Sequence, residues 1–276
     1  MKNILVPTDF SKNCNKAAKL GIEMAKLYNS EIHFLHLMKT PVDWVKLDKE
    51  KEKRYPETLK EIGVAKAKLR ALEKEAEHAG LNCRTFLEFD EGQEDILKHS
   101  GHFHHDFIIT GSSGTKGIIR EITGSNVEQI VRKSNAPVIV VKDEGVSFPF
   151  KNIVFVSDFE ENITQAFKQV ISIAKECNAN IHLLRINTKT DFNSIELGLN
   201  PIKELLQKFL DLKNYSISVY NEPSVETGIN TFVEQQPTDL IAMVTHGKTG
   251  FLSLFSKSIA EGVTNHATLP IMTIRI

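Results

Sequence analysis

The chain has 276 residues, of which 41% are hydrophobic and 25% are charged, and its formal net charge is -1. This composition is typical of a folded globular protein, and the length favours two domains over one. The charge balance excludes attraction of nucleic acid or anionic membranes to a generally basic surface. Three scattered cysteines without a CxxC pair argue against a disulfide framework.

The sequence also lacks a segment that would direct it to a membrane. The stretch MKNILVPTDF has only a short apolar run before Pro7, which is too short for the core of a signal peptide. No apolar run approaches the length of a membrane span. We therefore expect a soluble cytoplasmic protein with reduced cysteines and with neither a nucleic-acid nor a membrane partner.

Short apolar strands alternate with amphipathic helices along the first half of the chain. Ser11 is expected to cap the first helix, and a long charged helix is expected over 58–80. This alternation predicts a parallel sheet with helices on both faces and with any ligand at the carboxyl ends of the strands. The expected strands are Asn3–Val6, Ile32–Leu37, Cys83–Phe89, Asp106–Gly111 and Pro137–Val141.

Histidines gather just before the fourth expected strand, in the segment KHSGHFHHD. They are His99, His102, His104 and His105. Clustered imidazoles can bind zinc or nickel, but the spacing is far from that of standard zinc motifs, so we expect a solvated loop and leave metal binding open. His33 and His182 lie inside expected strands, where we interpret them as core residues with satisfied hydrogen bonds.

The fourth strand leads into the glycine-rich segment GSSGTKGIIREITGS. Gly111, Gly114 and Gly124 have the spacing G-x2-G-x9-G, and Ser125 follows as the expected first residue of the fourth helix, Ser125–Ser134. Glycines allow close approach of the backbone to a phosphate, and the free N–H groups at a helix N-terminus attract anions. The same segment could equally be an ordinary loop followed by a helix cap.

The second half of the chain repeats the first. KNILVPTDFSKN at Lys2 recurs as KNIVFVSDFEEN at Lys151, and APVIVV at Ala136 recurs as LPIMTI at Leu269. The distance between matching positions falls from 149 to 133 residues, so the first half carries the longer central insertion. Strands are expected again at Asn152–Val156, Ile181–Ile186, Ser216–Tyr220, Asp239–Val244 and Pro270–Ile274. The expected helices include 202–212 and Ser258–Ala267.

The repeat serves as an internal control on the glycines. Gly114 and Ser125 are matched by Gly247 and Ser258, whereas Gly111 and Gly124 are replaced by Val244 and Lys257. Glycines that are needed to build the fold should be present in both halves. We therefore attribute the two unmatched glycines to a ligand that binds only the first half.

At these residues the sequence resembles the universal stress protein family, in its tandem two-domain form. The resemblance spans essentially the whole chain and rests on ILVPTDFS, on APVIVV, and on GSSG…GS, which matches the family's ATP-binding pattern G-2x-G-9x-G-[ST]. It implies two Rossmann-like domains of the adenine nucleotide alpha hydrolase-like type, at 1–143 and 144–276. Each would hold a five-stranded parallel sheet with helices on both faces, and the two would pack as a pseudo-dimer through their last strands.

The resemblance also implies a binding site for ATP in the first domain, with accompanying Mg²⁺ left open. Adenine and ribose would lie near Pro7, Thr8 and Asp9, with backbone contacts from Leu37. The phosphates would lie against Gly111, Gly114, Gly124, Ser125 and Asn126. In the second half Asp158 keeps the carboxylate, but Val156, Val244 and Lys257 depart from the pattern, so we expect a degenerate site there.

The function expected from this resemblance is nucleotide-dependent regulation in a stress response. A slow ATPase or phosphotransferase is the first alternative, although no general base or metal-binding carboxylate accompanies the loop and Glu121 is its only acid. An interaction module that works without nucleotide is the second. Whether two chains pair is left open.

Overall fold

A computed structural model of the chain describes residues 2–89, 95–112, 127, 130–142, 146–160, 163–188, 195–245 and 269–276. The chain forms two compact units, Met1–Val141 and Lys142–Ile276. Among the helices within these ranges, none combines the length and the apolar composition that a membrane span requires.

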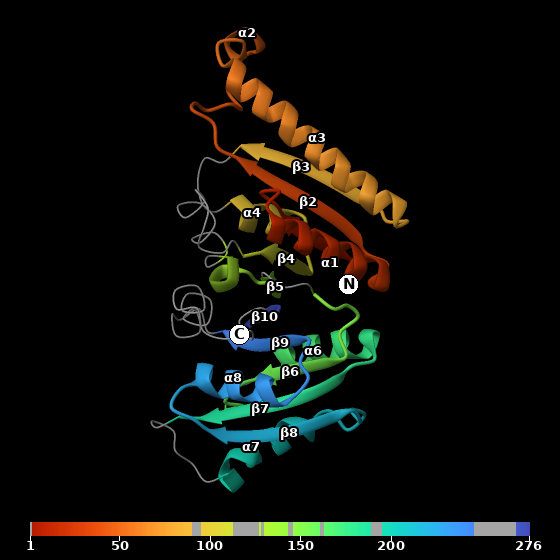
Figure 1. Cartoon of the computed structure of the whole chain (residues 1–276), viewed down its shortest axis with the longest axis vertical. Helices are drawn as coiled ribbons and strands as arrows, with labels where there is room; N and C mark the ends of the chain where they lie inside the picture. Colours follow the sequence, from red (N-terminus) through yellow and green to blue (C-terminus); the bar gives the residue numbers. More distant parts are fainter. Residues whose placement is uncertain are drawn as a thin grey trace. The chain divides into compact units, whose positions relative to one another are not determined.

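The first unit is a parallel sheet of five strands in the order β3-β2-β1-β4-β5 (Figure 1). Its strands are buried apolar runs, as a sheet covered on both faces requires. In chain order the elements are β1 (Asn3–Pro7), α1 (Lys12–Tyr28), β2 (Glu31–Met38), α2 (Lys49–Glu52), α3 (Pro56–His78), β3 (Cys83–Phe89), α4 (Asp95–His102), β4 (Phe107–Gly111) and β5 (Val138–Val141).

The strand order of the first unit contains one reversal, which locates the expected ligand site. The chain moves outward from β1 to β2 and β3, then returns to the other side of β1 with β4. Right-handed crossovers therefore place α1 and α3 on one face and α4 on the other. In such sheets ligands bind where the order reverses, here beyond the carboxyl ends of β1 and β4.

The second unit repeats this order as β8-β7-β6-β9-β10. One pair of equivalent contacts confirms the repeat: Asp106 Oδ2 accepts hydrogen bonds from the backbone of Lys2 and Asn3, and Asp239 Oδ2 from that of Lys151 and Asn152. The elements are β6 (Asn152–Val156), α6 (Thr164–Cys177), β7 (Asn180–Asn187), α7 (Ile195–Leu206), β8 (Tyr215–Asn221), α8 (Val225–Gln235), β9 (Leu240–Thr245) and β10 (Ile271–Arg275).

The structure confirms the expected α/β class and most of the expected elements, with two differences. The helix expected over 202–212 begins at Ile195 and ends at Leu206, with Pro201 in its interior. Burial of Ile202 and Leu205 stabilises this helix and offsets the energetic cost of a proline in its interior. His102 and His104 are exposed, as expected, but His99 is a buried residue of α4 and His105 is buried just before β4. The helix expected over Ser258–Ala267 lies outside the described residues.

Candidate functional site

The turn that follows β1 is fixed by its own side chains. Thr8 N donates to the carbonyl of Leu35 on β2 (2.8 Å), and Thr8 Oγ1 accepts from Phe10 N (3.0 Å). Phe10 has a positive φ of 63°, a conformation that non-glycine residues adopt only when neighbouring contacts hold them there. Ser11 then caps α1, as expected, by accepting from Cys14 N (3.3 Å).

Asp9 is the charged group at the centre of this turn. Its Oδ1 accepts from Ser11 N (2.8 Å), while its buried Oδ2 has no hydrogen-bond partner among the described residues. Burial opposes ionisation of the carboxyl group, but hydrogen bonds from Ser11 and Cys14 outweigh it and lower the pKa of Asp9. The site therefore holds an ionised carboxylate with one oxygen left to accept from a ligand hydroxyl or amine.

A pocket of about 520 Å³ opens beside Asp9, within the size range of small-molecule sites. His36 Nδ1 donates to the carbonyl of Thr8 (2.7 Å), and the rings of His36 and Phe10 lie 4.5 Å apart. Lys68 Nζ lies 5.0 Å from the centre of the Phe10 ring. The lining residues are Asp9 and Phe10 after β1, His36 on β2, and Glu57, Lys60, Glu61, Val64, Ala65 and Lys68 on α3.

This pocket offers flat aromatic surfaces together with charged groups of both signs. The rings of Phe10 and His36, tilted by 39° to each other, present flat surfaces, and the lining carries two lysines and three carboxylates. Burial lowers the pKa of His36, so at neutral pH the imidazole is neutral and its Nε2 is an acceptor. Phe10, His36 and Lys68 were not among the residues expected from the sequence. Only His36, a polar residue near the end of an apolar strand, gave a signal that could have been followed.

Gly111, at the carboxyl end of β4, packs against the first turn of α1. A Cβ atom at this position would lie 2.7 Å from the carbonyl oxygen of Asn13, and closer still to the Asn13–Cys14 peptide. Asn13 Nδ2 also donates to the carbonyl of Ser112 (2.5 Å), which ties the same turn to the end of the strand. The absence of a side chain at Gly111 therefore serves helix packing, a role that the comparison of the two halves did not reveal.

The second unit shows how the fold accommodates Val244 at the equivalent position. There α6 begins at Thr164, three residues after the position that matches the start of α1. Val244 is buried in the space that α1 approaches in the first unit. The later start of α6 thus accompanies a side chain at this position.

The structure brings together only part of the expected site. Thr8 and Asp9 form the turn, Pro7 pairs with Leu35, and Leu37 lies on β2 beside Glu88 of β3. Gly111 lies close to the same turn, because it packs against the start of α1. Gly114, Gly124, Ser125 and Asn126 lie outside the described residues, so their contact with phosphates stays a prediction.

The turn after β6 has the same geometry but a different neighbour. Phe159 has a φ of 62° and donates from N to Ser157 Oγ (3.0 Å), and Glu160 N donates to Asp158 Oδ1 (3.2 Å). Because both units form the turn in this way, one carboxylate oxygen of Asp9 serves to stabilise the turn. Unlike Asp9, however, Asp158 is exposed to solvent.

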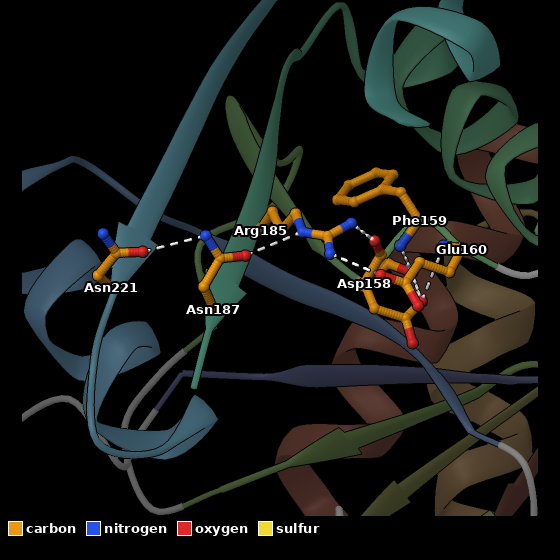
Figure 2. A network of polar contacts seen from close by, with 7 residues as sticks. Asp158, Phe159, Glu160, Arg185, Asn187 and Asn221 are labelled. Carbon is orange, nitrogen blue, oxygen red and sulfur yellow. Dashed lines mark hydrogen bonds and ion pairs between the residues drawn. The ribbon is translucent and has the colours of Figure 1, made fainter. Parts of the chain in front are cut away.

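Arg185 occupies the position in the second unit that His36 holds in the first, and it fills the corner beside the turn (Figure 2). Its side chain is 3% exposed. The guanidinium donates to the carbonyl of Asp158, to Glu160 Oε1 (2.7 Å) and to Asn187 Oδ1 (3.0 Å), and Asn187 Nδ2 donates to Asn221 Oδ1 (3.0 Å). Arg185 thus fills this corner with a buried side chain and holds the turn through the backbone carbonyl of Asp158 and the carboxylate of Glu160.

We expect Arg185→Gln to destabilise the second unit by about 2–3 kcal/mol, because it removes charged hydrogen bonds in a buried place. Hydrogen exchange of the β7 amides measures this loss. Arg84→Gln is the control, since Arg84 is also a strand residue paired with a glutamate but its side chain is 59% exposed; it should change the stability of the first unit by less than about 0.5 kcal/mol. Equal effects of the two changes would contradict a structural role for the Arg185 network.

Comparison with known proteins agrees with this architecture. The sequence model of the universal stress protein family matches residues 1–142 and again residues 149–275. Universal stress protein MJ0531 of Methanocaldococcus jannaschii is 30% identical over 142 residues, covering 51% of this chain and 82% of that protein. Universal stress protein MJ0577 of the same organism is 29% identical over 153 residues, covering 51% of this chain and 94% of that protein.

Among solved structures, a universal stress protein from Archaeoglobus fulgidus matches the whole architecture. It has a TM-score of 0.70 and 19% sequence identity, and the match covers 99% of this chain and 96% of that chain. At this identity the likeness concerns the fold. Because the family model accounts for both halves in turn, the chain belongs to the universal stress protein family and carries two copies of the family's domain.

Proposed function

We propose that the first unit binds an adenine nucleotide, ATP, and that the protein acts as a nucleotide-binding regulator of a stress response. The observation that carries this proposal is the buried, unpartnered Oδ2 of Asp9 at the reversal of the strand order. This oxygen can accept hydrogen bonds from ribose hydroxyls or from the adenine amine. The glycine motif follows β4 at the same edge of the sheet, where the phosphates would lie.

Binding is proposed for one unit because a buried arginine side chain fills the equivalent corner of the other. Arg185 engages Asp158 and Glu160 in the second unit, and Val244 and Lys257 replace two glycines of the motif. In the first unit the corresponding corner holds a pocket lined by the tilted rings of Phe10 and His36 and by charged residues that include Lys60 and Lys68. The difference between the units gives the protein one nucleotide-responsive half and one that keeps the fold. Packing of the two as a pseudo-dimer, pairing of chains and a cytoplasmic location stay predictions.

Release of the ligand from the purified protein tests this proposal. After denaturation we expect about one adenine nucleotide per chain, identified by chromatography and mass spectrometry, or, if none is retained, calorimetric binding of ATP to the stripped protein. Gly124→Lys, which copies Lys257 of the second half, should abolish this binding, whereas Gly117→Lys within the same segment but outside the motif should not. No bound nucleotide and no binding of added ATP would overturn the proposal in favour of an interaction module.

Incubation with Mg-ATP separates regulation from catalysis. The proposal predicts that bound ATP persists over many hours. Turnover that is lost in Gly124→Lys would instead assign an ATPase or phosphotransferase activity to the same site.

A further inference from the structure

Three buried histidines meet in the first unit, on the face of the sheet that α4 covers. They are His33 on β2, His99 in α4 and His105 just before β4, and they are 2%, 4% and 6% exposed. One ring nitrogen of each lies within 4.8 Å of those of the other two. His36 lies three residues after His33, on the opposite face of β2, so the nucleotide pocket and the histidine cluster are separate.

The outer nitrogen of each imidazole is held by an oxygen. His33 Nε2 lies 3.0 Å from Glu31 Oε1, His99 Nδ1 lies 2.6 Å from Glu88 Oε1, and His105 Nδ1 lies 3.4 Å from the carbonyl of Ser100. Histidines that ligate metals are oriented in this way, by donating the second N–H to a carboxylate or a carbonyl. The nitrogens left over are Nδ1 of His33 and Nε2 of His99 and His105.

A count of protons shows that the contacts of His33 and His105 cannot all be hydrogen bonds when both rings are neutral. From Glu31 through His33 and His105 to the Ser100 carbonyl there are three contacts, the middle one of 2.9 Å between His33 Nδ1 and His105 Nε2. Three hydrogen bonds need three protons, and two neutral imidazoles carry two. If each ring donates outward, two lone pairs face each other across 2.9 Å.

His99 supplies the second, independent observation. Its Nε2 is buried and has no hydrogen-bond partner among the described residues, although its Nδ1 is paired with Glu88. An extra proton on His33 would complete the row of contacts from Glu31 to Ser100 but would leave His99 Nε2 unpaired.

The second unit shows that the fold does not need this cluster. His182 takes the place of His33, but it is satisfied by Ser216 Oγ (2.6 Å) and Ser218 Oγ (3.0 Å). The positions of His99 and His105 are taken by Phe232, which is 1% exposed, and by Thr238. An apolar ring therefore fills the same place beneath the helix when no imidazole is present.

We propose that His33 Nδ1, His99 Nε2 and His105 Nε2 bind one Zn²⁺ ion in the first unit, with Glu31, Glu88 and Ser100 as the outer shell. Imidazole nitrogens suit zinc, and three protein ligands leave a fourth position for water or an anion. Tetrahedral zinc with nitrogens at about 2.0–2.1 Å places them about 3.3 Å from one another. The separations present, 2.9 Å and up to 4.8 Å, bracket that value. Phe86 packs against His33 and His99, and Phe103 packs against all three imidazoles.

Titration with Zn²⁺ alone, without nucleotide, tests this inference independently of ATP binding. Full-length protein stripped with a chelator should bind one Zn²⁺ per chain in competition with a chromophoric chelator, and Co²⁺ in its place should give the visible absorption of a tetrahedral site. His99→Phe, which copies the second unit, should weaken Zn²⁺ binding at least about 100-fold while the protein stays folded. His102→Ala is the control, because His102 is exposed on the same helix and should leave the affinity unchanged.

Fluorescence of Trp44, the only tryptophan, reports whether the first unit of each variant is folded. If His99→Phe is unfolded, Glu88→Ala takes its place, and loss of this outer-shell carboxylate should weaken binding about 10- to 100-fold. The inference is overturned if the stripped wild-type protein binds no Zn²⁺, or if a folded His99→Phe or Glu88→Ala variant binds it as the wild type does.

Discussion

Replacement of Gly111 by alanine should destabilise the first unit by about 2–4 kcal/mol, although it adds a single methyl group. The new carbon would meet the backbone of Asn13 and Cys14 at the start of α1, and backbone cannot rotate away as a side chain can. Either α1 shifts as a whole or its first turn unwinds, and both changes break the Asn13–Ser112 hydrogen bond. Urea unfolding followed by Trp44 fluorescence measures the loss, because Trp44 is buried in the first unit.

Gly63→Ala provides the matched control for this measurement. Gly63 lies in α3, and a Cβ atom built on it meets nothing within 4 Å. Alanine in an open helix position should raise the free energy of unfolding by about 0.5–1 kcal/mol. The same glycine-to-alanine change is thus expected to lower the free energy of unfolding at Gly111 and to raise it at Gly63. A Gly111→Ala variant as stable as the wild type would mean that α1 and β4 do not approach as closely as described.

Asp9→Asn should weaken ATP binding about 10- to 100-fold, the value of a hydrogen bond to a charged group. Asparagine keeps an oxygen that can accept from Ser11 N, so the turn is preserved. It replaces the unpartnered Oδ2 by an NH₂ group, which cannot accept from a ribose hydroxyl or from the adenine amine. Calorimetric titration of nucleotide-stripped protein with ATP measures the change, and Trp44 fluorescence verifies the fold.

Asp158→Asn is the control for Asp9→Asn, because Asp158 accepts in the same way from Glu160 N in the equivalent turn of the second unit. ATP affinity should stay within about twofold of the wild type, since Arg185 occupies that corner. If both variants bind as tightly as the wild type, the contribution of Asp9 is limited to the turn. Weaker binding in Asp158→Asn would place nucleotide in the second unit.

The fold was predictable from the sequence because its signals are local and repeated. Apolar strands such as 152–156 and 107–111, and the cap at Ser11, follow from composition and spacing alone. The family resemblance named Thr8 and Asp9, which lie together in the turn after β1, and their contact with a nucleotide stays a prediction. The start of α7 was predicted wrongly because of Pro201. Burial of its neighbours in the folded unit outweighs the cost of a proline inside a helix, and no local sequence pattern reports such burial.

Contacts between distant elements could not be predicted. The closeness of Gly111 to the start of α1 depends on how a helix lies on a strand about 100 residues away in the sequence. The expectation of a solvated histidine loop was wrong for His99 and His105 for the same reason. His33 on β2 joins His99 and His105 only because β2 lies beneath α4, and the sequence spacing of the later pair gave no sign of a partner near the start of the chain.

The central claim is that one unit of this tandem protein binds nucleotide and the other keeps only the fold. The number of ATP molecules bound per chain, measured by calorimetry on nucleotide-stripped full-length protein, tests that claim most directly. We expect one ATP per chain in the wild type and in Asp158→Asn, with greatly weakened binding in Asp9→Asn. Two ATP molecules per chain, or one whose affinity depends on Asp158 and not on Asp9, would contradict the account.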